Sequence, residues 1–190
     1  MNYINTNLGF YDNKIVVEDT GSNWNGFEVM MDWEHPMMSS SAAYVTQNGG
    51  DILEIGFGMG ISAGYIQSHS IDSHIIVENH PQIIPKAVEW ASNKSNVTIV
   101  SQSWYDVKDS IGTFDGIFYD TWGDDNGLQF SSSLSNWTKN GTKVTWWHDY
   151  QNNNSNIHSI RNVTWKSINV SPAENTYFNS TTYYLPMKEF

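Results

Sequence analysis

The sequence of 190 residues predicts an α/β fold whose core is a doubly wound, mostly parallel sheet of seven strands. Three observations favour this fold. From residue 49 onward, short apolar runs alternate with segments long enough for one helix each, a pattern typical of βαβ units. The first run leads directly into a glycine-rich loop. The last two runs leave little room for a helix between them, so they predict an antiparallel pair.

The N-terminal part is expected to form a short hairpin and one longer helix. Residues Leu8–Tyr11 and Ile15–Glu18 flank a turn at Asp12-Asn13, which predicts two antiparallel strands. The helix is expected to run from His35-Pro36 to about Gln47, because proline is well tolerated in the first turn of a helix.

The rest of the chain is expected to supply the strands of the sheet, which are Asp51–Ile55, His74–Glu78, Val97–Val100, Phe114–Tyr119, Lys143–Trp147, Val163–Val170 and Thr181–Leu185. The connecting helices are expected at Ser62–Ser68, from Pro81 to about Ser92, at Trp104–Ile111 and at Leu128–Thr138. Pro81 is interpreted as a first-turn proline. A weak helical pattern at Asn156–Arg161 follows a linker-like stretch, Gln151–Asn156.

The composition excludes several classes of protein and site. The chain contains no cysteine, so it has no disulfide, thiol nucleophile or cysteine-ligated metal centre. No apolar run approaches the ~20 residues that a membrane helix requires, and the N-terminus lacks the basic and apolar regions of a secretory signal. We therefore expect a cytoplasmic protein that does not insert into a membrane, and we identify no metal site.

The net charge gives a first indication of the partner. Nine basic and twenty acidic residues give a formal net charge of −11 at pH 7. This charge disfavours binding to the phosphates of a nucleic acid and suits a cationic partner.

The most informative segment runs from Ile52 to Gly60, where an apolar strand enters Gly-x-Gly-x-Gly and then a helix. Gly56 permits a tight turn, and Gly58 lets the backbone approach a ligand closely. Glu78 lies 22 residues after Gly56, at the end of the next strand, where a carboxylate can accept two hydrogen bonds from ribose hydroxyls. The alternative is a flexible glycine turn followed by an unrelated surface acid.

The spacing of the glycines separates two candidate ligands. Dinucleotide sites use Gly-x-Gly-x-x-Gly and place a pyrophosphate at the helix N-terminus. Here the third glycine comes one residue earlier, and no basic residue is nearby to meet a phosphate. A ligand with ribose but no phosphate, such as S-adenosylmethionine, is therefore favoured over the nicotinamide cofactor of an oxidoreductase.

Four segments in this order carry a resemblance to a known family: Val29–Met38, Glu54–Gly60, Ile76–Pro81 and Phe114–Thr121. The Trp-Glu-x-Pro piece of the first and the Tyr-Asp-Thr piece of the last are more specific than the glycine loop. From about Gly26 to Asp149 the chain resembles guanidinoacetate methyltransferases and the related enzymes that methylate the delta-nitrogen of protein arginine. The resemblance implies a Rossmann-like methyltransferase fold and N-methylation of a guanidino nitrogen by S-adenosylmethionine.

The resemblance also implies contacts to the cofactor, which becomes S-adenosylhomocysteine in the reaction. The glycine loop matches the part that lines the methionine and ribose, Glu78 matches the ribose ligand, and Ser103-Trp104 matches a pair at the adenine. The full set of implied cofactor positions is Met38, Phe57, Gly58, Met59, Gly60, Ile61, Ser62, Glu78, Asn79, Ser103, Trp104 and Asp120.

Two acids, Glu34 and Asp120, match the family's carboxylates that grip the guanidinium, and they are the implied catalytic residues. A guanidinium presents five N–H donors in one plane, so two carboxylates fix both its position and its plane. Asp120 is the expected acceptor of the proton that the reacting nitrogen loses. Asp149 and Tyr150 align with further substrate-binding positions, although their residue types differ from those of the family.

Each of these two acids also has a purely structural interpretation. Glu34 is alternatively a helix-entry cap or a surface acid, and Asp120 is alternatively an Asx-turn residue that ends a strand. Against this, five candidates follow the carboxyl ends of predicted strands: Gly56, Glu78, Ser103, Asp120 and Asp149. We expect them on one rim of the sheet, where open α/β sheets bind ligands.

The region after Asp149 is shorter than in guanidinoacetate methyltransferases, and the chain shows no counterpart of the protein-recognition domain of the arginine-modifying relatives. We therefore expect a small guanidino or amine substrate. Residues 1–48 are expected to cover substrate and cofactor, and residues 49–190 to form the methyltransferase core. Methylation of a different small amine and non-catalytic binding of S-adenosylmethionine stay open, as does the choice between a monomer and a homodimer.

Overall fold

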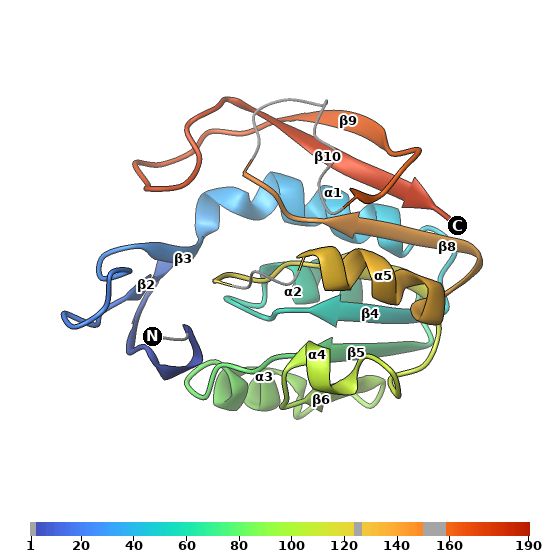
Figure 1. The fold of residues 1–190 in the computed structure, drawn as a ribbon, viewed down its shortest axis with the longest axis horizontal. Helices are drawn as coiled ribbons and strands as arrows, with labels where there is room; N and C mark the ends of the chain where they lie inside the picture. The colour runs from blue at the N-terminus through green and yellow to red at the C-terminus, as the bar shows by residue number, and fades with distance from the viewer. Residues whose placement is uncertain (1–2, 124–126, 150–158) are drawn as a thin grey trace.

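The computed structural model describes residues 3–123, 127–149 and 159–190, and the strands of these residues form two sheets (Figure 1). The smaller sheet consists of β1 (Leu8–Tyr11), β2 (Lys14–Val17) and β3 (Glu28–Met31). The larger sheet consists of β4 (Asp51–Ile55), β5 (Ser73–Val77), β6 (Val97–Val100), β7 (Phe114–Tyr119), β8 (Thr138–Trp146), β9 (Thr164–Asn169) and β10 (Thr182–Glu189).

The larger sheet has the strand order β6-β5-β4-β7-β8-β10-β9. Neighbouring strands from β6 to β8 are parallel, and β10 pairs antiparallel with both β8 and β9. The predicted fold class, the seven strands and the antiparallel C-terminal pair are therefore confirmed. The chain moves outward from β4 in both directions, so the carboxyl ends of β4 and β7 form the switch point at which such sheets bind ligands.

The helices are α1 (His35–Val45), α2 (Ile61–Gln67), α3 (Ile84–Ala91), α4 (Trp104–Val107) and α5 (Gly127–Trp137), with short 3-10 turns η1 (Tyr3–Asn5) and η2 (Asp32–Glu34). The helix predicted at Trp104–Ile111 is shorter than expected, and the strand predicted at Lys143–Trp147 is longer. The linker-like stretch, residues 151–156, lies outside the described residues, as does the first half of the weak helical pattern, residues 156–158.

Both faces of the larger sheet are covered by helices, which is why its strands are apolar on both faces. On one face Ile52 of β4 joins residues of α1 and α2 in a buried cluster. On the other face the neighbouring Leu53 and Ile55 pack with residues of α4 and α5. Figure 1 shows α5 on the near face and α2 on the far face of β4.

The prediction that Pro81 lies in the first turn of a helix is wrong. α3 begins at Ile84, and the proline in its first turn is Pro85. The three residues before α3 form a turn. The side chain of Gln82 leaves this turn and accepts a hydrogen bond from the amide of Leu8 (2.8 Å). The segment after β5 is therefore held by the smaller sheet and does not continue the helix backward.

The predicted N-terminal hairpin is present as β1 and β2, and the structure adds a third strand. β3 pairs antiparallel with β2 and leads through η2 into α1. Figure 1 shows this smaller sheet beside the end of the larger sheet at which β4 enters its glycine loop. Among the described residues, no helix has both the length and the apolar character to cross a lipid bilayer.

Candidate active site

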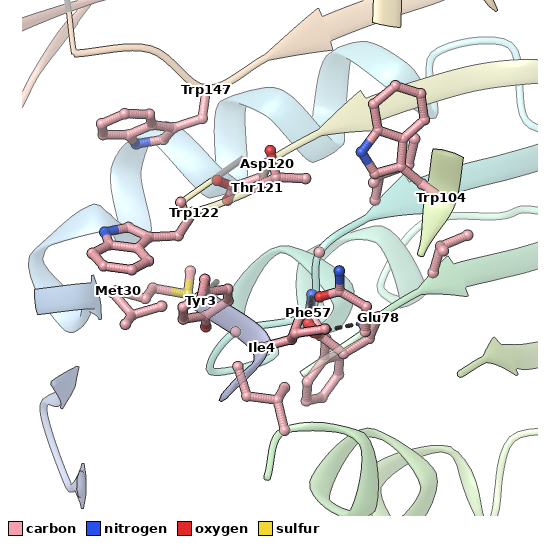
Figure 2. A pocket seen from close by; sticks show the side chains of 18 of the residues that line it. Tyr3, Ile4, Met30, Phe57, Glu78, Trp104, Asp120, Thr121, Trp122 and Trp147 are labelled. Carbon is pink, nitrogen blue, oxygen red and sulfur yellow. Dashed lines mark hydrogen bonds between the residues drawn. The ribbon is translucent and has the colours of Figure 1, made fainter. Parts of the chain in front are cut away.

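A cavity of about 680 Å³ lies at the carboxyl ends of β4 to β8 and is bounded on its other side by η1 and β3. This volume is within the range of small-molecule sites. The five residues expected on one rim, Gly56, Glu78, Ser103, Asp120 and Asp149, all line it. Figure 2 shows the cavity between Trp104 at one end and Trp147 at the other.

Gly56 brings the end of β4 against the end of β7. Its φ is +93°, and a β-carbon at this position would lie 1.8 Å from the carbonyl oxygen of Asp120. The amide of Asp120 in turn donates to the carbonyl of Ile55 (2.8 Å). Only glycine satisfies both conditions, so Gly56 determines where the backbone of Asp120 meets the cavity.

Glu78 is fixed at the end of β5 by backbone amides. Its Oε1 accepts from the amides of Asn79 (2.8 Å) and His80 (2.7 Å), and its Oε2 accepts from the amide of Phe57 (3.0 Å). Burial raises the pKa of the Glu78 carboxyl, and these hydrogen bonds act in the opposite direction. The donors come from the glycine loop and from the residues directly after Glu78.

Ser103 and Trp104 lie where β6 leads into α4. The Ser103 hydroxyl accepts from the amide of Tyr105 (3.3 Å) as the N-cap of this helix. The buried Trp104 ring meets the rings of Tyr119 and Trp137 edge-on, with centroids 5.7 and 5.8 Å away. Trp104 therefore belongs to the core and to the cavity wall at once.

Glu34 ends η2 and is only 3% exposed, so it is not a surface acid. Its Oε1 accepts from the amide of Met31 (2.9 Å) and the hydroxyl of Tyr177 (2.7 Å), and its Oε2 accepts from Nε1 of Trp147 (3.1 Å). Burial raises the pKa of Glu34 to about 7, although all three hydrogen bonds lower it. The Met31 contact is a local cap, whereas the other two donors come from distant elements.

Asp120 differs from Glu34 because no described residue donates a hydrogen bond to its carboxylate. The Asx-turn interpretation is therefore not supported by any contact. Burial raises the pKa of Asp120 well above its ordinary value, and the charges of Glu34, Glu54 and Glu78 raise it further. Two carboxylates that repel one another thus share one end of the cavity, and only one of them has donors.

The cavity wall is strongly acidic. Among the described residues that line it there is no lysine, arginine or histidine, and its acids are Glu34, Glu78, Asp106, Asp120 and Asp149. Carboxylates in a partly desolvated cavity interact strongly with a cation, because the effective dielectric there is lower than in water. The arrangement is suited to binding a cation and to accepting a proton from it.

Part of the implied cofactor set lies away from the cavity wall, namely Met38, Met59, Gly60, Ile61 and Ser62. Met38 is 1% exposed, on the face of α1 that packs into the core, and the buried Ser62 donates to Glu54. Phe57, Gly58 and Asn79 do line the cavity. Tyr150 lies outside the described residues. The ligand contacts of all these residues stay predictions.

The smaller sheet contacts the glycine loop directly. The amide of Met59 donates to the sulfur of Met30 in β3 (3.2 Å). A β-carbon at Gly58, whose φ is +53°, would lie 2.6 Å from the same sulfur. The space that Gly58 leaves is therefore taken in part by the N-terminal region of the chain.

Aromatic side chains that the sequence did not point to complete the wall: Tyr3, Trp122, Trp147 and Tyr177. The ring centroids of Tyr3 and Trp122 are 4.9 Å apart, and those of Trp147 and Tyr177 are 5.8 Å apart. Trp122 and Trp147 follow the carboxyl ends of β7 and β8, and this position in the sequence is the one feature that could have predicted their place on the cavity wall. Tyr177 lies between β9 and β10, 143 residues from Glu34, and no local pattern marks it.

Comparison with known proteins identifies a family that this chain matches and several relatives with similar sequences. The model of the guanidinoacetate N-methyltransferase family matches residues 11–142. Protein arginine N-methyltransferase 2 of Aspergillus oryzae is 36% identical over 132 residues, which cover 66% of this chain and 30% of that protein. The enzyme of the same name from Saccharomyces cerevisiae is 34% identical over 130 residues, with 63% and 30% covered. The chain thus matches about 30% of the length of these curated relatives.

Solved structures support the fold alone. Spermidine synthase from Thermotoga maritima superposes with a TM-score of 0.66 at 14% identity, over 96% of this chain and 72% of that chain. A putative methyltransferase, yhhF, from Escherichia coli gives a TM-score of 0.61 at 13% identity, over 90% of this chain and 96% of that chain. Both likenesses agree with a Rossmann-like methyltransferase architecture.

Proposed function

This chain belongs to the guanidinoacetate N-methyltransferase family, and from that premise we propose that it transfers the methyl group of S-adenosylmethionine to a nitrogen of a small guanidino compound. One observation carries the proposal: Glu34 and Asp120 share one end of a cavity whose described lining contains no basic residue. A guanidinium is the cation that such a pair matches best, because its N–H donors lie in one plane and meet carboxylates in parallel.

The cavity residues fit S-adenosylmethionine by charge and by hydrogen bonding. The acidic wall suits its positively charged sulfonium, whereas a dinucleotide phosphate would meet only acids among the described charged residues that line the cavity. Backbone amides of Phe57, Asn79 and His80 already donate to the Glu78 carboxylate, and the amide of Gly58 also favours its ionised form, so ribose hydroxyls would share this carboxylate with backbone donors. Ser103 and Trp104 are the proposed neighbours of the adenine. When bound, S-adenosylmethionine supplies an electrophilic methyl group on sulfur.

Glu34 and Asp120 have different parts in the proposed binding of substrate. Glu34 is held by three donors, so it offers the guanidinium a fixed edge. Asp120 has no described donor, so its lone pairs are open to the N–H groups of the substrate. A guanidinium between the two favours the ionised form of both carboxyls and so opposes the burial that raises the pKa of each.

The proposed transfer is a direct displacement. The lone pair of the guanidino nitrogen bonds to the methyl carbon while the carbon–sulfur bond breaks and its electron pair stays on sulfur. The protonated nitrogen is a poor nucleophile, so it must lose a proton near the transition state, and Asp120 is the acceptor in this proposal. Holding the reacting atoms in line at ~3 Å accounts for several kcal/mol of the rate enhancement.

We also propose that residues 1–48 cover the site. Tyr3, Met30 and Glu34 belong to this region and line the cavity, which supports the role. Figure 2 shows Trp122 and Trp147 beside Asp120, so aromatic rings crowd the substrate end. This crowding favours a free guanidino compound over an arginine on the surface of a folded protein.

The test is transfer of label from methyl-labelled S-adenosylmethionine to a panel of guanidinoacetate, arginine, agmatine and simple amines. We expect label in a guanidino compound together with an equal amount of S-adenosylhomocysteine. Labelling of amines but of no guanidino compound would contradict the substrate class. Tight cofactor binding without any turnover would indicate a non-catalytic binding protein, and calorimetric binding of a nicotinamide cofactor in its place would contradict the cofactor.

A further inference from the structure

We propose that the substrate is a guanidinium whose other end carries no negative charge, and that a positively charged end is preferred. This inference rests on the proposed function and narrows its substrate class, which otherwise includes acids such as guanidinoacetate. It is carried by the charges on the cavity wall and by the places that the basic side chains occupy.

The wall carries more negative charge than the two proposed ligand groups can balance. Five acids line the cavity from its cofactor end to its substrate end: Glu34, Glu78, Asp106, Asp120 and Asp149. Bound S-adenosylmethionine and a guanidinium together bring a net charge of about two positive units, fewer than these carboxylates. A substrate with a positive end reduces the remaining imbalance, and one with a negative end increases it.

Seven of the nine basic side chains have described partners away from the cavity wall, and the other two, Arg161 and Lys166, do not line it. Lys14 lies 3.9 Å from Glu28 and Lys139 lies 2.9 Å from Asp115, both away from the cavity wall. The other lysines with described ion pairs or ring contacts are Lys86, Lys94, Lys108, Lys143 and Lys188. Residues 124–126 and 150–158 contain neither lysine nor arginine in the sequence.

Asp149 is the acid that the tail of the substrate is expected to meet. It is exposed at the rim, two residues after Trp147, whose indole donates to Glu34. In this proposal, a guanidinium held by Glu34 and Asp120 directs its alkyl chain toward the part of the rim at which Asp149 lies. A carboxylate at the end of that chain would be repelled by the carboxylate of Asp149, whereas an ammonium would form an ion pair with it.

A series of three compounds with the same four-methylene spacer tests the inference: agmatine with a positive end, pentylguanidine with an apolar end and guanidinovalerate with a negative end. We expect kcat/KM to fall in this order, by at least about tenfold between the first and the last. Added salt should narrow the ratio, because it screens charges near the surface. Equal or faster methylation of guanidinovalerate would overturn the inference.

Charge reversal at the rim separates a local effect from the net charge of the protein. Asp149→Lys should lower the preference for agmatine over guanidinovalerate at least about threefold and change pentylguanidine least. Glu89→Lys makes the same charge change on the exposed face of α3, outside the cavity wall, and should leave the ratio unchanged. Equal shifts in both variants would contradict a role for the cavity wall.

The neutral compound distinguishes failure of this inference from failure of the proposed function. Methylation of pentylguanidine supports guanidino methyl transfer whatever the tail. If pentylguanidine is methylated but guanidinovalerate is preferred over agmatine, the inferred charge preference is wrong and the proposed function stands. If no guanidine is methylated, both the inference and the proposed function are wrong. A blocked peptide with one arginine has an uncharged end, so it should be methylated more slowly than agmatine. Its preferential use over agmatine would contradict the preference for a positive end and would identify the substrate as a protein.

Discussion

The two ends of the cavity hold their carboxylates in different ways. At the proposed cofactor end, Glu78 is fixed by backbone amides that belong to the glycine loop and to its own two following residues. At the proposed substrate end, Glu34 accepts from the local amide of Met31 and from the side chains of Trp147 and Tyr177, which lie 113 and 143 residues away. Asp120 has no described donor at all.

Under the proposed function, this difference separates binding of the cofactor from choice of the substrate. The described donors to Glu78 are backbone groups of the loop after β4 and of the residues directly after β5, so its position depends on that one βαβ unit. The substrate end needs the finished sheet, since its donors follow β8 and precede β10. Substitutions near the C-terminus are therefore expected to alter substrate binding while leaving the cofactor end intact.

The largest expected effect tests the acid without donors. Asp120→Asn keeps the shape of the side chain but removes the proton acceptor, so turnover should fall about a thousandfold. The dissociation constant for S-adenosylmethionine, measured by calorimetry, should change less than about threefold. Asp109→Asn is the matched control at an exposed position and should retain full turnover. Normal turnover of Asp120→Asn would show that another group accepts the proton.

The second effect tests the cofactor end. Glu78→Gln leaves one acceptor oxygen, so its N–H₂ group must face at least one of the backbone amides that now donate to the carboxylate, and it removes the charge proposed for the ribose. Hydrogen bonds to a charged group contribute about 1.5–3 kcal/mol, so S-adenosylmethionine should bind about ten- to hundredfold more weakly. Thermal unfolding of the variant verifies that it is folded. An unchanged dissociation constant would remove Glu78 from the cofactor site.

The third effect tests the distant donors at the substrate end. Tyr177→Phe removes the hydroxyl that favours the ionised form of Glu34, so the pKa of Glu34 should rise above its value of about 7. We expect the KM for the guanidino substrate to increase about five- to tenfold at pH 7. Because Glu34 then becomes protonated at a higher pH, the increase in KM on acidification should begin at a higher pH than in the wild type. The affinity for the cofactor should change little. Tyr184→Phe, outside the cavity wall, is the control, and an identical pH profile in both variants would contradict this role of Tyr177.

The smallest effect concerns stability. Folding raises the pKa of Asp120, so over an interval of pH the folded chain keeps a proton that the unfolded chain has lost. The wild-type free energy of unfolding therefore falls as the pH rises through that interval. Without ligands, Asp120→Asn should be more stable than the wild type by about 1 kcal/mol at pH 8, and the difference should shrink at pH 5. Unfolding by denaturant measures this difference in the free energy of unfolding. A variant that is less stable than the wild type at pH 8 would contradict the claim that the ionised Asp120 carboxylate destabilises the fold.

Local sequence patterns predicted the strand and the loop whose shape depends on backbone geometry. The run at Asp51–Ile55 and the glycines after it predicted β4 and its loop, and the position of Glu78 followed from the length of one βαβ unit. The same reasoning misplaced the start of α3 because two prolines, Pro81 and Pro85, both suit a first turn. The choice between them depends on the contact of Gln82 with the smaller sheet, which no local pattern shows.

The sequence alone was sufficient to predict the order of the elements and the family, and it supplied Glu34 and Asp120 as the two candidate acids, because each prediction rests on short contiguous patterns. Tertiary structure decided how those acids differ. Tyr177 and Trp147 reach Glu34 only when β8 and β10 lie beside the strands that precede them, and Gly56 meets the Asp120 backbone only when β4 and β7 pair. Side-chain donors separated by more than a hundred residues are brought together by packing, and packing is a property of the whole sheet.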